Sequence, residues 1–258
     1  MKQLTEQQIQ DNWLKLRGII NDTFEGERLE KLNKMYDYFE DRMVVAPASA
    51  KEHYHNACVG GYVEHVIHIV EMSQQVRDLW LQNGADINFT NEELIFAALH
   101  HDLGKVGDLE HDYYVINESE WHRKNQGKIY NHNSDLTFMT VTDRALFLLQ
   151  HFQIPMNENE YLGLKLTDGM YEDANEKYLK TFLPETGLRS HIARILHQAD
   201  MMATYIEGDE WERAGQVGKQ KVAKSVSNIK QAVDTEVKTK LTGDSPKDLF
   251  DELFGDKK

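Results

Sequence analysis

The stretch His100-His101-Asp102-Leu103-Gly104-Lys105 gathers imidazole, carboxylate and amine groups into one short segment. It directly follows the apolar run Leu94–Leu99, which is typical of a buried helix. His101 lies at helical spacing from Leu94 and Ala98, so we expect it on the same buried face. A buried imidazole beside a buried carboxylate is costly unless a cation compensates for it. The stretch therefore predicts a site for a divalent metal ion.

Two other segments place a polar side chain on an apolar helix face. His65 is the only polar member of a helical stripe that continues to Leu79. Asp200 lies between Leu196 and Ala203 on a second apolar face. Together with the His-Asp pair, these residues offer two imidazoles and two carboxylates. Such a donor set suits Mn, Fe, Co, Ni, Mg or Zn, and the sequence does not choose among them. We expect one ion, with room for a second.

These residues resemble the pattern of the HD-domain metal-dependent phosphohydrolases, which is a His, a later His-Asp pair and a distant Asp. His65, His101-Asp102 and Asp200 match it in order, context and spacing. The segment Lys51-Glu52-His53-Tyr54-His55, which leads into Gly60-Gly61, is similar to the branch of bacterial 3'-to-5' exoribonucleases with HD domains. The resemblance covers residues 51–207. It implies an all-α HD-domain helical bundle in which the four matching residues bind the metal.

The resemblance also implies a reaction, the hydrolysis of a phosphoester or phosphoanhydride by a metal-activated water. A nucleotide is the expected substrate. Lys105 follows the His-Asp pair on a tight turn, where it could bind the substrate and offset phosphate charge; the alternative role is an ion pair with a carboxylate.

Three other functions remain open from the sequence. One is 3'-to-5' cleavage of single-stranded nucleic acid. Another is a di-iron oxygenase, because some HD relatives use an iron pair; these need six ligands, and Thr167 stands where relatives carry one. The third is a degenerate HD module used only for binding, against which the intact set of four ligands argues.

A second metal would need further ligands between the His-Asp pair and the last Asp. His132 and His151 are candidates by their positions, and His132 is also a candidate contact for the substrate phosphate. Asp168 is a candidate second-metal ligand or general base, because relatives carry a His-His or His-Asp pair there. Thr167, at the first position of that pair, counts against a complete dinuclear site. We expect His100 and His197 to support the neighbouring ligands.

Periodicity and capping residues predict an all-α fold with a small β-hairpin. Asn91-Glu92-Glu93 is expected to cap the helix that carries His101, and Gly104 to let the chain leave it. The predicted hairpin has strands at 112–116 and 128–130, with a turn at 117–120. Helices are expected from Thr5, at 28–42, from Gly60-Gly61 to Asn83, and at 142–152, 158–166 and 188–206.

Composition narrows the compartment and the partners. The 258-residue chain has 29 basic and 43 acidic residues, a net charge of −14, which argues against stable binding to duplex DNA. Cys58 is the only cysteine, so no disulfide can form within the chain, as suits a reducing cytoplasm. The polar start of the chain lacks the apolar block of a signal peptide, and no apolar run is long enough to span a membrane.

Four regions are expected along the chain: N-terminal helices packed on the core (1–50), the phosphohydrolase core (51–207), a basic helical extension (208–244) and an acidic tail rich in Leu and Phe (245–258). In the tail, residues 248–255 place two Leu-Phe pairs one helical turn apart. They resemble the short tails by which polymerases of large tailed phages bind their sliding clamp, which implies a clamp-like partner. The alternative is that the tail packs on its own core.

Overall fold

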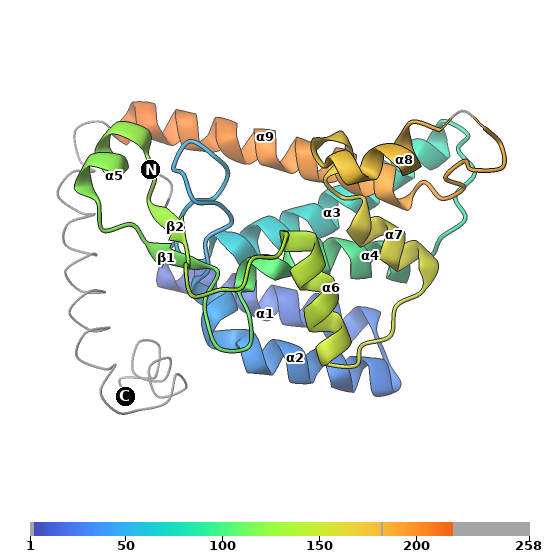
Figure 1. The fold of residues 1–258 in the computed structure, drawn as a ribbon, viewed down its shortest axis with the longest axis horizontal. Coiled ribbons are helices and arrows are strands. Elements are labelled where there is room, and N and C mark those ends of the chain that lie inside the picture. Colours follow the sequence, from blue (N-terminus) through green and yellow to red (C-terminus); the bar gives the residue numbers. More distant parts are fainter. Residues whose placement is uncertain (1–2, 182, 219–258) are drawn as a thin grey trace.

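The computed structural model describes residues 3–181 and 183–218. Figure 1 shows a helical protein in which α9 (Ile192–Gly218), α3 (Gly61–Gln82) and the pair α1 (Glu6–Thr23) and α2 (Gly26–Val45) form successive layers. The only sheet of the described residues is a two-stranded antiparallel hairpin. The predicted all-α fold with a small hairpin is therefore confirmed.

The N-terminal helices begin where the capping residues indicate. The Thr5 side chain accepts a hydrogen bond from the backbone of Gln8, and the Gln8 side chain accepts one from the backbone of Thr5. The apolar stripe of α1 from Ile9 to Ile20 is buried. Both α1 and α2 pack against α3, which becomes the centre of the core.

The helix that delivers His101 is α4 (Asn91–His100), and it packs between α3 and α7 (Glu158–Lys165). Its N-cap is Thr90, whose side chain pairs with Glu93, so the predicted cap at Asn91 is one residue too late. The Thr90 hydroxyl accepts a hydrogen bond from the backbone N–H of Glu93, which has no partner within the helix.

Past α4 the chain does not leave at Gly104 as predicted. It continues as the 3-10 helix η1 (Leu103–Val106), and Gly107 is the residue with a left-handed φ of 107°. Gly104 has a different role, because a Cβ there would collide with the carbonyl oxygen of Val141. Its lack of a side chain lets α6 (Val141–His151) pack closely on η1.

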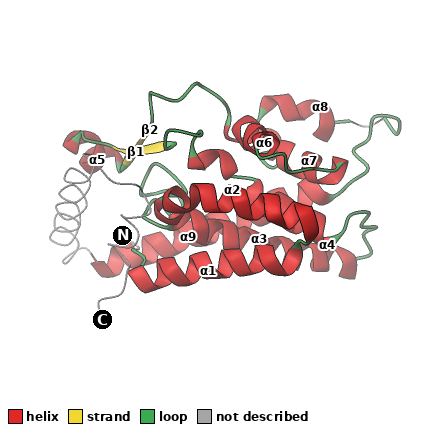
Figure 2. Cartoon of the chain, turned by 90° about the horizontal axis from the view of Figure 1, so that it is seen from below, coloured by secondary structure: helices red, strands yellow, loops and turns green. Residues whose placement is uncertain are grey.

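The hairpin consists of β1 (Tyr114–Ile116) and β2 (Tyr130–His132), with Tyr114 opposite His132. The turn predicted at 117–120 is wrong. Ser119 caps a further helix, α5 (Glu120–Gln126), which lies beside the strands in Figure 2. The Ser119 side chain accepts from the backbone of His122, so the polar cluster starts a helix instead of reversing the chain.

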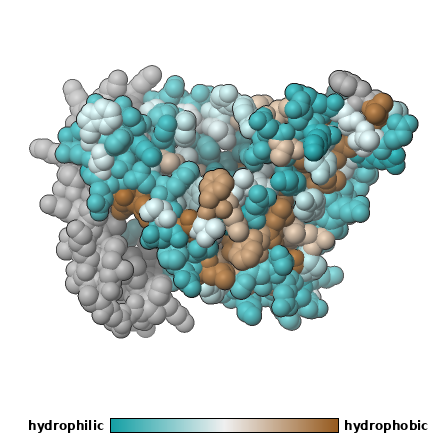
Figure 3. All heavy atoms as spheres, viewed as in Figure 1, coloured by the Kyte–Doolittle hydropathy of each residue, from teal (hydrophilic) through white to brown (hydrophobic). Residues whose placement is uncertain are grey.

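Helix α9 runs without a break across the expected boundary at 207/208 and is described to Gly218. Between α7 and α9 lie η2 (Gly169–Tyr171), η3 (Asp173–Asn175) and the short α8 (Glu176–Leu179). The rest of the basic extension and the tail, with its expected partner contact at 248–255, lie outside the described residues. None of the described helices is both long and apolar enough to cross a membrane. Hydrophilic residues cover much of the face in Figure 3.

Candidate metal centre

The structure brings the four predicted ligands together from three helices. His65 comes from α3, His101 and Asp102 directly follow α4, and Asp200 comes from α9. Nε2 of His65 lies 3.5 Å from Oδ1 of Asp200 and 3.7 Å from Oδ2 of Asp102. Nε2 of His101 lies 3.5 Å from the same oxygen of Asp102. His65, His101 and Asp102 are buried and Asp200 is half-buried, and together these groups could hold a metal ion.

The other ring nitrogens fix which atoms face the centre. Nδ1 of His101 donates to the carbonyl of Ala98 at 2.8 Å, and Nδ1 of His65 donates to Glu207 at 3.1 Å. This tautomer, assigned from these partners, leaves a lone pair on each Nε2. Both Nε2 atoms are buried and make no hydrogen bond. A lone pair that faces carboxylate oxygens repels them unless a proton or a metal cation lies between, so these residues fit a metal ion.

The charges at the centre also favour a cation. Burial alone would lower the pKa of His65, but the carboxylates of Glu207 and Asp200 outweigh it and raise the pKa to about 10. Burial would raise the pKa of Asp200 and of Glu207, but interactions with His65 hold both pKa values well below their usual range. Several ionised carboxylates thus surround one imidazole, which a divalent ion would bind in place of a proton.

Glu207 is a functional candidate that the sequence reasoning missed. It lies on α9 two turns after Asp200, so both carboxylates share one helix face. It is buried and accepts from Nδ1 of His65 and, at 2.7 Å, from Nδ1 of His68. A carboxylate that holds the far nitrogen of a ligating histidine orients the ring and raises its basicity. The spacing of seven residues was the signal that could have found it.

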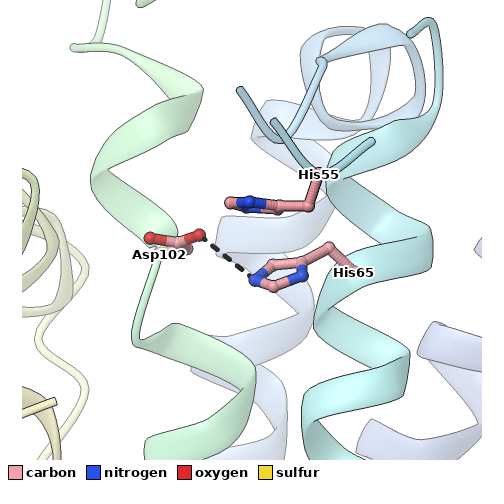
Figure 4. Close-up of side chains that lie close together, drawn as sticks. All are labelled: His55, His65 and Asp102. Carbon is pink, nitrogen blue, oxygen red and sulfur yellow. Dashed lines mark ion pairs between the residues drawn. The ribbon is translucent and has the colours of Figure 1, made fainter. Parts of the chain in front are cut away.

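His55 is a second missed candidate. The sequence reasoning did not place it among the ligands, yet its ring lies 4.5 Å from the ring of His65, centroid to centroid. Figure 4 shows His55 and His65 one above the other, with Asp102 facing both. Nε2 of His55 is buried without a hydrogen-bond partner. Burial, followed by the nearby charge of His65, lowers the pKa of His55 to about 3, so the ring is neutral.

Lys105 forms an ion pair with a carboxylate, which was the alternative role considered for it from the sequence. Its Nζ lies 2.6 Å from Oδ2 of Asp102. Burial would lower the pKa of Lys105, but Asp102 and then Tyr114 raise it above its usual range. The same side chain lines a pocket of about 670 Å³ between the end of α2 and the hairpin. Lys105 thus connects the centre to the pocket.

Asp168 lies at the edge of the centre, on the turn after α7. It is exposed, and its Oδ2 accepts from Oγ1 of Thr142 at 3.3 Å. The protein atoms packed around the carboxylate raise its pKa, as do the charges of Asp102 and Asp200. Nδ1 of His197 donates to the carbonyl of Thr167 at 2.7 Å and so holds this turn in place.

The structure does not group His132 and His151 with the predicted ligands. His132 is exposed on β2, and its ring contacts Tyr113 and Tyr114. His151 is exposed at the end of α6 farthest from η1, about 15 Å along the helix from Val141. Among the described residues, the close groups of metal donors contain neither histidine.

Comparisons with protein-family models, curated proteins and solved structures find no match for the chain.

Proposed function

We propose that the protein is a metal-dependent phosphohydrolase that cleaves a phosphoester or phosphoanhydride bond of a nucleotide. The observation that carries this proposal is the pair of buried, unpartnered Nε2 atoms of His65 and His101, which face the carboxylates of Asp102 and Asp200. Lys105 adds a cation beside them. A metal ion held against carboxylates, next to a fixed ammonium, suits a substrate with phosphoryl oxygens.

A divalent ion bound there would polarise a phosphoryl oxygen and lower the pKa of a bound water. The protein supplies the other requirements. Nζ of Lys105 can balance charge on the non-bridging oxygens of the substrate. Asp168 can accept a proton from the attacking water, since its raised pKa makes it a better base than an ordinary carboxylate.

The adjoining pocket supports a nucleotide as substrate. Its volume of about 670 Å³ is within the usual range for small-molecule sites. Tyr113, Tyr114 and Tyr130 line it, so flat aromatic faces are available to a base. Arg42 and Arg123 add positive charge to its wall, and the ion pair of Arg42 with Asp112 holds that arginine in place. Lys105 lies where the phosphoryl end of such a ligand would meet the centre.

The test is a hydrolysis screen of the purified protein, with nucleoside mono-, di- and triphosphates and Mn, Co, Ni, Fe, Zn or Mg. Ribose 5-phosphate serves as a matched substrate without a base. We expect metal-dependent release of phosphate or pyrophosphate, faster from at least one nucleotide than from ribose 5-phosphate. A metal-loaded protein that hydrolyses none of these substrates would contradict the proposal.

The second candidate is 3'-to-5' cleavage of single-stranded nucleic acid. The three tyrosines of the pocket favour it, because aromatic rings stack on bases without regard to sequence. End-labelled single-stranded oligonucleotides in the same screen separate the two candidates. An exonuclease shortens them stepwise, whereas a nucleotidase leaves them intact.

A further inference from the structure

We infer that His55 is a direct metal ligand, so that the centre binds one ion through three imidazoles and two carboxylates. This donor set selects a transition metal over magnesium. The inference rests on the metal centre of the proposed function but not on hydrolysis. The five ligands are His55, His65, His101, Asp102 and Asp200.

Three imidazole nitrogens at the centre lack a partner. Nε2 of His55, of His65 and of His101 are all buried and make no hydrogen bond. They come from three segments, namely the loop before α3, α3 itself and the end of α4. A buried nitrogen without a partner loses its hydration and gains nothing in return. Three such atoms at one place indicate a shared partner.

The donor atoms lie close enough together to approach one ion. The donor atoms of His55, His65 and Asp102 all lie within 4.8 Å of one another, and so do those of His65, His101 and Asp200. Bonds of about 2.0–2.2 Å to a transition metal place two donors on one ion at most about 4.4 Å apart. Side-chain movements that bring the two groups together around the shared His65 would place all five donors on one ion.

The two groups share His65, which favours one ion over two. Its Nε2 has a single lone pair, so it can bind only one metal. Oδ2 of Asp102 supports the same conclusion, because it lies 3.7 Å from Nε2 of His65 and 3.5 Å from Nε2 of His101. In Figure 4 the ring of His55 approaches the same carboxylate from the side of the loop.

The loop before α3 holds His55 in place through an unusual backbone conformation. Oγ of Ser49 donates to the carbonyl of His55 at 2.7 Å. The next residue, Asn56, has a left-handed φ of 43°, which is uncommon for a residue other than glycine. A Cβ on Gly61 would collide with the carbonyl oxygen of Asn56, so only glycine lets the loop approach α3 this closely. Such backbone conformations cluster at functional sites.

The consequence is metal selectivity. The four ligands predicted from the sequence include only two imidazoles, so magnesium is among the metals that they could bind. A third imidazole shifts the site toward Fe, Co, Ni or Zn, because magnesium prefers oxygen ligands and retains its waters. We therefore expect binding of Co, Ni or Zn to be at least tenfold tighter than that of magnesium.

The experiment compares His55→Ala with His53→Ala. His53 is exposed on the same loop and packs on Tyr54, so it is a matched control. Competition with a chelator measures the affinities for Co and Zn, and pulsed EPR of the Mn-loaded protein counts the coordinated imidazole nitrogens. We expect three nitrogens in the wild type and in His53→Ala but two in His55→Ala, with at least tenfold weaker Co binding only in His55→Ala.

Several outcomes would overturn the inference. A count of two nitrogens in the wild type, or an unchanged count in His55→Ala, removes His55 from the ligands. Weaker metal binding with an unchanged count would make it a positioning residue that packs on His65. Normal metal binding with weakened binding of inorganic phosphate would make it a substrate contact. The melting temperatures of the metal-free variants, including His55→Gln, show whether a substitution has impaired folding. Each measurement remains decisive if the protein hydrolyses nothing.

Discussion

The histidines of the interior and those of the surface differ in what their ring nitrogens contact. In the interior, Nδ1 of His65 and of His101 each donate to a fixed acceptor, so each Nε2 is directed at the carboxylates. On the surface, the ring of His132 lies on two tyrosines, and the ring of His151 lies beside Phe147 and Phe152. Histidine content alone therefore does not mark a candidate metal site, whereas a buried Nε2 without a hydrogen-bond partner beside carboxylates does.

The largest effect expected from this comparison is loss of the metal in Asp102→Ala and in His101→Ala. Asp102 faces both imidazoles and Lys105, so its removal takes away a ligand and leaves buried groups unpaired. We expect no bound metal by elemental analysis and turnover at background in both variants. His122→Ala, at an exposed position on α5, is the control. Normal metal content in either variant would refute the site.

A smaller effect is expected from Glu207→Gln, which keeps the shape but removes the charge behind His65 and His68. Loss of such a partner of a ligating histidine typically weakens metal binding about 10–100-fold. A chelator competition assay measures this change, with Glu212→Gln, exposed on the same helix, as the control. Equal affinity in the two variants would show that Glu207 only neutralises His68.

The sequence predicted the part of the centre that helical periodicity governs. His65 and Asp200 each interrupt an apolar stripe of a long helix, and His101 directly follows the apolar helix α4; such patterns are readable without a structure. Glu207 continues the face of Asp200 and could have been found by the same rule. His55 could not, because its loop has no period and is positioned by Ser49 and Asn56. Its only signal was the resemblance carried by residues 51–55.

The candidate ligands for a second metal show what spacing along the chain cannot predict. Spacing along the chain placed His132 and His151 after the His-Asp pair, but spacing does not determine which end of α6 faces η1. Gly104 brings the Val141 end of α6 to the centre and so leaves His151 at the far end. The prediction of a turn at 117–120 failed for a related reason, since Ser119 can start either a turn or a helix.

His100 also tests the comparison of histidines, because it is buried next to His101 but both of its ring nitrogens have hydrogen-bond partners. Nδ1 contacts the carbonyl of Phe96 at 2.7 Å, and Nε2 contacts the hydroxyl of Tyr36 at 3.3 Å. Burial, aided by the charge of Arg28, lowers the pKa of His100 to about 3, against a usual value of 6.5. Below pH 6.5 the unfolded chain therefore takes up a proton that the folded protein does not.

As the pH falls from about 6.5 toward 3, this histidine should cost up to about 1.4 kcal/mol of unfolding free energy per pH unit. The measurement is urea unfolding of the metal-free protein at pH 7 and pH 5. In His100→Gln the loss of stability over this interval should be smaller by about 2 kcal/mol, since that proton uptake is absent. His122→Gln should behave like the wild type. Equal slopes in all three proteins would mean that His100 protonates within the fold.

The smallest effects are expected at the surface histidines, and they test the comparison most directly. In His151→Ala and in His132→Ala we expect unchanged metal stoichiometry and a change in unfolding free energy of about 0.5 kcal/mol or less, because exposed side chains away from caps and cores contribute little. His132 also lies on Tyr113, which lines the pocket, so we expect His132→Ala to raise the KM for a nucleotide while leaving kcat unchanged. Elemental analysis and steady-state kinetics of both variants give these values. Two ions in the wild type and one in either variant would show that a surface histidine completes a second metal site. In that case an unpartnered Nε2 in the interior would no longer distinguish metal ligands from other histidines.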